Sequence, residues 1–125
     1  MTHKPDHFTV WAELPVTDLD RATAFYNKVF ETELQRDDNG PNPMAVFPTA
    51  DGQGSAGHLY PGTPAKDGNG PTIHLAVPGK LEDAMARVTE AGGKVLSDPI
   101  TIPAGRFAYA IDLDGNSIGL FETAA

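Results

Sequence analysis

The chain repeats itself at a distance of 61 residues, and this internal repeat limits its fold more than any other feature. Residues 8–16, "FTVWAELPV", alternate between apolar and polar side chains, and residues 71–77, "PTIHLAV", do the same. A period of two is typical of a strand with one buried face. Val16 in the first stretch corresponds to Val77 in the second. The repeat predicts two copies of one structural unit.

A helix pattern follows each of these strands. In residues 17–30 the apolar side chains recur at steps of three and four, and Thr17 or Asp18 can cap the first turn. Residues 79–93 show the same spacing and end at a Gly-Gly pair, which is a common way for a helix to stop. Each half therefore begins with a strand and a helix.

Short strand patterns complete each half. They lie at 44–48 and 55–60 in the first half, and at 94–102, 106–112 and 116–121 in the second. The loops between them are rich in Gly, Pro, Asn and Asp, and the stretch 61–70 separates the halves. The sequence predicts one α+β domain over residues 1–125, built from two βαβββ half-modules at 8–60 and 71–122.

The apolar strand faces need cover, and the helices are expected to supply it on one side of the sheet. The other faces of the two half-sheets can then curl toward each other. This predicts a curved mixed sheet around a cavity, with the helices on the outer face. Strand alternation directs Trp11, Glu13, Thr72 and His74 toward that cavity.

The same alternation predicts which side chains face the helices. The apolar residues of the first strand, beginning at Val10, are expected to pack against the first helix. Tyr109 is assigned to the helix-facing core as well, because Phe107 and Ile111 have its parity.

Bulk composition excludes several classes of function. The 125 residues include no Cys, which rules out disulfides, thiolate catalysis and Cys-bound zinc. The net charge is −8 and no basic cluster is visible, so nucleic acid is not an expected partner. No apolar run reaches membrane-spanning length, and the N-terminal residues lack the apolar stretch of a secretory signal. A cytoplasmic location is expected, with no membrane partner.

A glycine in the last strand pattern, "NSIGLF", is unusual. Gly119 lies where a side chain could pack, and glycine weakens a strand. It either leaves room for a bound ligand or permits a bulge or a close approach of another group.

Three segments together resemble one known family. "PVTDLDRATAFYNKVF" resembles the first strand-to-helix signature of the vicinal oxygen chelate superfamily, which includes glyoxalase I, bleomycin resistance proteins and extradiol dioxygenases. "LAVPGKLEDAMARVTEAGGKV" resembles the corresponding second-half segment, and "DLDGNSIGLFE" is similar to the closing Asp-Pro-Asp-Gly-Asn motif, with Leu113 in place of Pro. The resemblance covers roughly residues 8–122 and implies the fold rather than a reaction.

The resemblance also implies where a metal would bind. The family's metal enzymes take one ligand from each of four strands, and the matching positions here are Trp11, His58, Thr72 and Gly119. Only His58 has a side chain suited to a divalent cation. The usual metal site is therefore expected to be missing, and no cofactor is predicted.

Three other polar groups keep alternatives open. Glu13, His58 and His74 lie on the same inferred face, and two His with one carboxylate could form a shifted site for a divalent metal. Glu13 and His74, at equivalent positions of the repeat, could instead act as catalytic acid and base. They could also merely hydrogen-bond to one another or to water.

The preferred hypothesis is a glyoxalase/bleomycin resistance-like protein that binds a small organic molecule between its modules. Trp11, the only Trp, could stack on a cationic or aromatic ligand or could simply fill the cavity. The expected ligand-binding residues are Trp11, Glu13, His58, Thr72, His74 and Gly119. The alternatives are a glyoxalase-type lyase or isomerase, using the shifted metal or the Glu13–His74 pair, and an accessory module of another protein. The resemblance also implies a homodimer.

Overall fold

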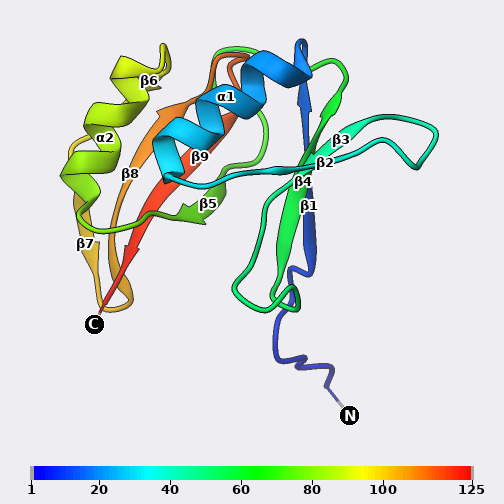
Figure 1. Cartoon of the computed structure of the whole chain (residues 1–125). Coiled ribbons are helices and arrows are strands. Elements are labelled where there is room, and N and C mark those ends of the chain that lie inside the picture. Colours follow the sequence, from blue (N-terminus) through cyan, green and yellow to red (C-terminus); the bar gives the residue numbers. More distant parts are fainter. Residues whose placement is uncertain (1, 125) are drawn as a thin grey trace.

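The chain folds into two related units, each a strand, a helix and further strands, with one strand more in the second, and the computed structural model describes residues 2–124 (Figure 1). The first unit contains β1 (Trp11–Val16), α1 (Leu19–Phe30), β2 (Gln35–Asp37), β3 (Met44–Val46) and β4 (Ala56–Pro61). The second contains β5 (Ile73–Ala76), α2 (Leu81–Glu90), β6 (Lys94–Val95), β7 (Ile100–Ile102), β8 (Gly105–Ile111) and β9 (Ser117–Thr123). The α+β class is confirmed. Neither helix of the described chain has the length and hydropathy needed to cross a membrane.

Each unit forms its own mixed sheet. The strand order is β1-β4-β3-β2 in the first and β5-β9-β8-β6 in the second, with β7 added on β8. The first strand of each unit runs parallel to the last, and the remaining pairs are antiparallel. The curved sheet is thus divided into two halves, and β1 and β5 are each the edge strand of their own half.

Strand register confirms the repeat at the level of single residues. Glu13 lies opposite His58 in the first sheet, and His74 lies opposite Gly119 in the second. Both members of the second pair follow their counterparts by 61 positions, as the sequence predicts.

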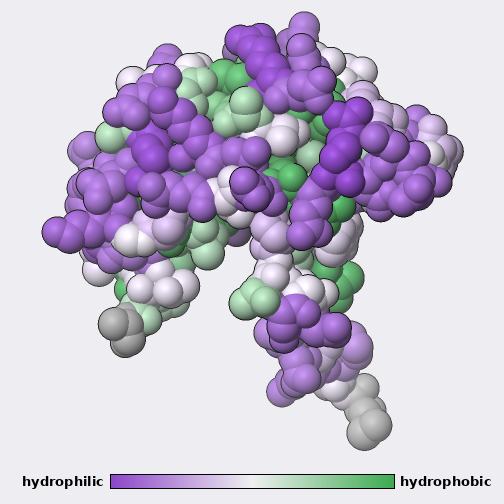
Figure 2. Space-filling view, viewed as in Figure 1, coloured by the Kyte–Doolittle hydropathy of each residue, from purple (hydrophilic) through white to green (hydrophobic). Residues whose placement is uncertain are grey.

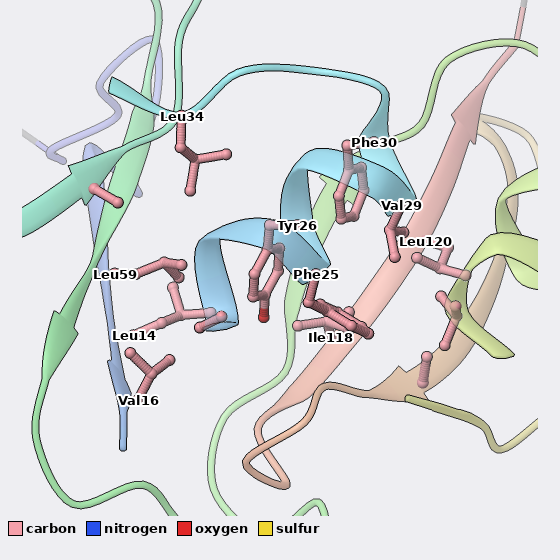
Figure 3. Packing of buried hydrophobic residues seen from close by; sticks show 14 of the residues in the cluster. Leu14, Val16, Phe25, Tyr26, Val29, Phe30, Leu34, Leu59, Ile118 and Leu120 are labelled. Atoms are coloured by element: carbon pink, nitrogen blue, oxygen red, sulfur yellow. The ribbon is translucent and has the colours of Figure 1, made fainter. Parts of the chain in front are cut away.

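One hydrophobic core joins the two units under α1. Asp18 caps this helix by accepting a hydrogen bond from the Arg21 N–H, and Glu31 ends it in the left-handed conformation. Its apolar face is fully buried, and Figure 3 shows Tyr26 and its neighbours between the β1–β4 side and the β9 side. The buried cluster includes residues of both sheets, among them Leu14, Val16, Leu59, Ile118 and Leu120.

The closing motif of the second unit clamps the first. The buried Asp112 carboxylate accepts a 2.7 Å hydrogen bond from the Tyr26 hydroxyl, and Asp114 accepts from the hydroxyl and N–H of Thr17. The Asn116 side-chain amide donates to the Pro15 carbonyl at 2.8 Å. Burial, and then the Asp112 charge, raises the pKa of Tyr26 well above its ordinary value, so its hydroxyl remains a donor. The motif therefore fastens the two units together.

The sheets diverge from this clamp. In Figure 1 the β1–β4 pair and the β5–β9–β8 group separate toward the end where the chain termini lie, and Figure 2 shows a hollow between the two arms. The molecule is an arch with one clamped end and one open end.

Two predictions about strand faces are wrong. Val10 precedes β1 and is 68% exposed, because the helix cover begins only with the strand itself. Tyr109 faces away from the helices and is 37% exposed, whereas Ala108 and Ala110 are fully buried. Strand β8 is apolar on both faces, and its small alanines rather than its aromatic residues face the helices.

Candidate ligand-binding site

A cavity lies between the two edge strands at the open end of the arch. It measures about 460 Å³ and contacts Trp11 and Ala12 at the start of β1 and all four residues of β5. Consecutive strand residues point to opposite faces of a sheet, so a cavity that contacts all of them must lie along the strand's edge. The cavity is therefore a crevice between sheets rather than a hollow on one face.

Its lining is mostly apolar. The end of α1 contributes Phe30, the loop after β3 contributes Phe47, and β5 contributes Ile73 and Leu75. The remaining lining residues are Thr9, Thr32, Pro48, Thr49, Ser55, Ala56, Gly57, His74 and Ala76. Among the described residues that line the cavity, His74 is the only titratable one.

Trp11 is held at the cavity by a hydrogen bond from its indole N–H to Nδ1 of His58, at 2.9 Å. The other ring nitrogen of His58, Nε2, lies 3.4 Å from the Glu13 carboxylate. Because Nδ1 accepts a hydrogen bond, the ring proton of neutral His58 belongs on Nε2, toward Glu13. The Trp11–His58–Glu13 chain thus fixes the indole by its polar edge and leaves its ring free for other contacts.

The His74 ring packs directly over Gly119, which leaves no room for a side chain at position 119. A Cβ atom added to Gly119 would overlap the His74 imidazole. The ring also makes edge-to-face contact with Phe107, with centroids 5.1 Å apart, and lies 5.9 Å from the Tyr109 ring. Of the two explanations that the sequence left open, the close approach of another group accounts for this glycine.

The structure divides the predicted site residues. Trp11 and His74 line the 460 Å³ cavity, while Glu13 lines a smaller one of about 170 Å³ toward the clamp. His58 lies beside Trp11, Gly119 lies under His74, and the Thr72 hydroxyl is hydrogen-bonded to Ser117. The apolar lining was not predicted, because strand and helix periodicity directed Phe30, Ile73 and Leu75 to the sheet–helix interface and gave Phe47 no role.

The proposed catalytic pair and shifted metal site are not assembled. Glu13 pairs with His58, while His74, on the other sheet, forms no ion pair within residues 2–124. In that part of the chain no three His, Asp or Glu side chains gather in a way that could hold a metal ion.

The family's usual metal site does not fit these residues either. At the four matching positions, Trp11 is bonded through its N–H to His58, Thr72 is bonded to Ser117, and Gly119 has no side chain. A divalent cation would find one imidazole there, with its Nδ1 already engaged.

Comparison with known proteins agrees with this architecture. A model of the glyoxalase/bleomycin resistance protein/dioxygenase superfamily matches residues 4–120. A glyoxylase-like domain-containing protein of Didymella fabae is 30% identical over 113 residues, which cover 84% of this chain and 85% of that protein.

Solved structures show the same fold at lower identity. A glyoxalase/bleomycin resistance protein from Albidiferax ferrireducens superposes with a TM-score of 0.73 at 18% identity, covering 92% of this chain and 98% of that one. The trypanothione-dependent glyoxalase I of Leishmania major gives 0.69 at 15% identity, covering 94% and 87%. The chain belongs to the glyoxalase/bleomycin resistance protein/dioxygenase superfamily.

Proposed function

We propose that this protein binds a small, uncharged and largely apolar organic molecule in the crevice between β1 and β5, without the family's usual metal. The observation that supports this most directly is the cavity itself. Its volume of about 460 Å³ falls within the range of small-molecule sites, and its lining is mainly apolar with a few polar groups.

The lining favours an aromatic ligand over a cationic one. The Trp11 ring borders the cavity and can stack on a planar group, while its N–H is already used by His58. The carboxylate on which a cationic ligand would depend, Glu13, lies outside this lining. Of the cationic or aromatic ligand expected from the sequence, the proposal therefore keeps only the aromatic one.

Binding is also favoured over acid–base catalysis. The enzyme hypothesis needs Glu13 and His74 at one substrate, but Glu13 faces His58 while His74 is packed on Gly119 among aromatic rings. General acid–base catalysis requires both groups within hydrogen-bonding reach of the reacting atoms. The geometry thus supports a protein that sequesters or senses its ligand.

Fluorescence of the single Trp provides the test. The purified protein is titrated with a panel of aromatic metabolites and drugs, and each emission change is checked by calorimetry. Filling the cavity with Ala76→Phe should lower the affinity of any hit at least about tenfold, because the new ring occupies the ligand's volume. Ala86→Phe, on the exposed face of α2, is the matched control and should leave affinity unchanged. Equal effects of both variants, or none from Ala76→Phe, would refute the assignment.

A further inference from the structure

We infer that the ligand is peptide-like: it has secondary amides that pair with the unoccupied backbone edge of β5, as an added strand would. This inference rests on the proposed function, since it names the chemical class that the same crevice accepts. It follows from the direction of the β5 backbone groups and from what borders them.

The hydrogen-bond pattern of β5 leaves two residues unpaired. The Val77 N–H donates to the Phe121 carbonyl at 2.9 Å, which continues the parallel ladder with β9. In such a ladder only alternate residues bond to a given neighbour, so Ile73 and Leu75 share the orientation of Val77. The N–H and C=O groups of His74 and Ala76 therefore point away from β9.

These groups point into the crevice. All four β5 residues line the cavity, and β5 has no strand partner except β9 among residues 2–124. Unpaired backbone groups on a strand edge attract another extended chain, because each lacks a hydrogen-bond partner from the protein. The β5 edge thus offers two donors and two acceptors beside an apolar cavity.

The facing edge of β1 is less available. The Gly62 N–H donates to the Val16 carbonyl, so by the same alternation Trp11, Glu13 and Pro15 point their backbone groups away from β4. Pro15 has no N–H, and its carbonyl already accepts from Asn116. Proline on an edge strand commonly prevents another strand from pairing with it. Strand addition is accordingly assigned to β5.

The surroundings define the side chains of such a ligand. Phe30, Phe47 and Leu75 make the crevice apolar, and no Asp, Glu, Lys or Arg lines it. An uncharged backbone with small apolar or aromatic substituents fits this setting, because a buried unpaired charge would be costly. The ligand class is a short, neutral peptide or peptide-like compound.

Amide hydrogen exchange in the free protein is the first test. The N–H groups of His74 and Ala76 should exchange rapidly, whereas those of Ile73 and Leu75 should be protected by the ladder with β9. Protection of His74 and Ala76 that grows with protein concentration would mean that a second copy fills the edge. Protection that is independent of concentration would mean that the edge is already paired. Either result would overturn the inference.

The second test uses N-acetyl-valyl-valine N-methylamide as the probe. Its binding should protect His74 and Ala76 and leave Leu75 unchanged. Two isomers, each N-methylated on a different valine, provide the matched pair, because only one valine directs its N–H to β5. One isomer should lose about tenfold in affinity through its lost hydrogen bond, and the other should lose less.

The outcomes separate this inference from the proposed function. If aromatic compounds bind at Trp11 while the dipeptide probe fails at millimolar concentration, the peptide-like class is wrong and the binding function stands. The class is also wrong if the probe binds without protecting His74 and Ala76, or if both isomers bind as tightly as the parent. If no compound binds, or if Ala76→Phe leaves the affinity of every hit unchanged, the proposed function itself fails.

Discussion

Removing one hydroxyl from the clamp, by Tyr26→Phe, should measurably loosen the contact between the two units. Tyr26 is fully buried, Asp112 is 4% exposed, and their hydrogen bond is 2.7 Å long. A hydrogen bond to a charged group contributes about 1.5–3 kcal/mol to stability. The Asp112 Oδ2 atom would keep its 3.0 Å bond from Asn116, which places the expected loss in the lower half of that range. The aromatic contacts of the ring with Phe30 and its other neighbours should survive in the variant.

Urea unfolding followed by circular dichroism measures this loss as a lower midpoint at an unchanged slope. Tyr60→Phe is the matched control, since the Tyr60 hydroxyl makes no hydrogen bond within residues 2–124. Its effect should stay within about 0.5 kcal/mol, as for substitutions away from specific contacts. If Tyr26→Phe costs no more than the control, the clamp does not hold the units together and the reasoning from buried hydrogen bonds is wrong.

Three further predictions concern charge, packing and assembly. Arg106 lowers the pKa of Glu82 to about 2. The stability that this pair contributes is therefore present above the ordinary pKa of 4.5 and is lost as the pH falls toward 2. Glu82→Gln should flatten that part of the pH–stability curve, and an unchanged curve would contradict the prediction. Gly119→Ala should displace the His74 ring and shift its NMR signals relative to Phe107, whereas unchanged shifts would mean that the ring does not rest on Gly119. The homodimer that we propose from the family resemblance predicts twice the chain mass in light scattering at micromolar concentration, and the mass of one chain would count against it.

The repeat made most of the fold predictable. Alternation over residues 8–16 and 71–77 depends only on local side-chain polarity, and it located the first strand of each unit and their equivalent positions. The closing motif was recognised by resemblance, yet its role was not predicted. Thr17 lies 97 residues from its partner Asp114, and Tyr26 lies 86 residues from Asp112, so only the folded chain reveals these contacts.

The site was harder to predict because it lies between elements. Alternation can assign a residue to a face, but the crevice follows the edges of β1 and β5, where both faces contribute. Tyr109 was misplaced because hydropathy alone does not distinguish two apolar faces of one strand. The alanines at 108 and 110 were the available signal, since small side chains allow a helix to approach a sheet closely.

The clamp in the second unit has an equivalent turn in the first unit that does not bind the other unit. This difference between the two units leaves the arch open at one end. Counting back 61 positions from Asp112 and Asn116 gives Asp51 and Ser55. Asp51 keeps the local turn, accepting from the Gln53 N–H as Asp112 accepts from the N–H two residues on, but Asp51 is exposed.

The same count pairs Pro15, whose carbonyl Asn116 holds, with Ala76. Ser55 stands in the position of that asparagine and forms no side-chain hydrogen bond to Ala76 within residues 2–124, although both line the cavity. Equivalent hydrogen bonds from both turns would have joined the two pseudo-symmetric units at both ends of the arch. One turn without the bond to the other unit therefore leaves the crevice open at that end, while the equivalent turn holds the units together at the other end.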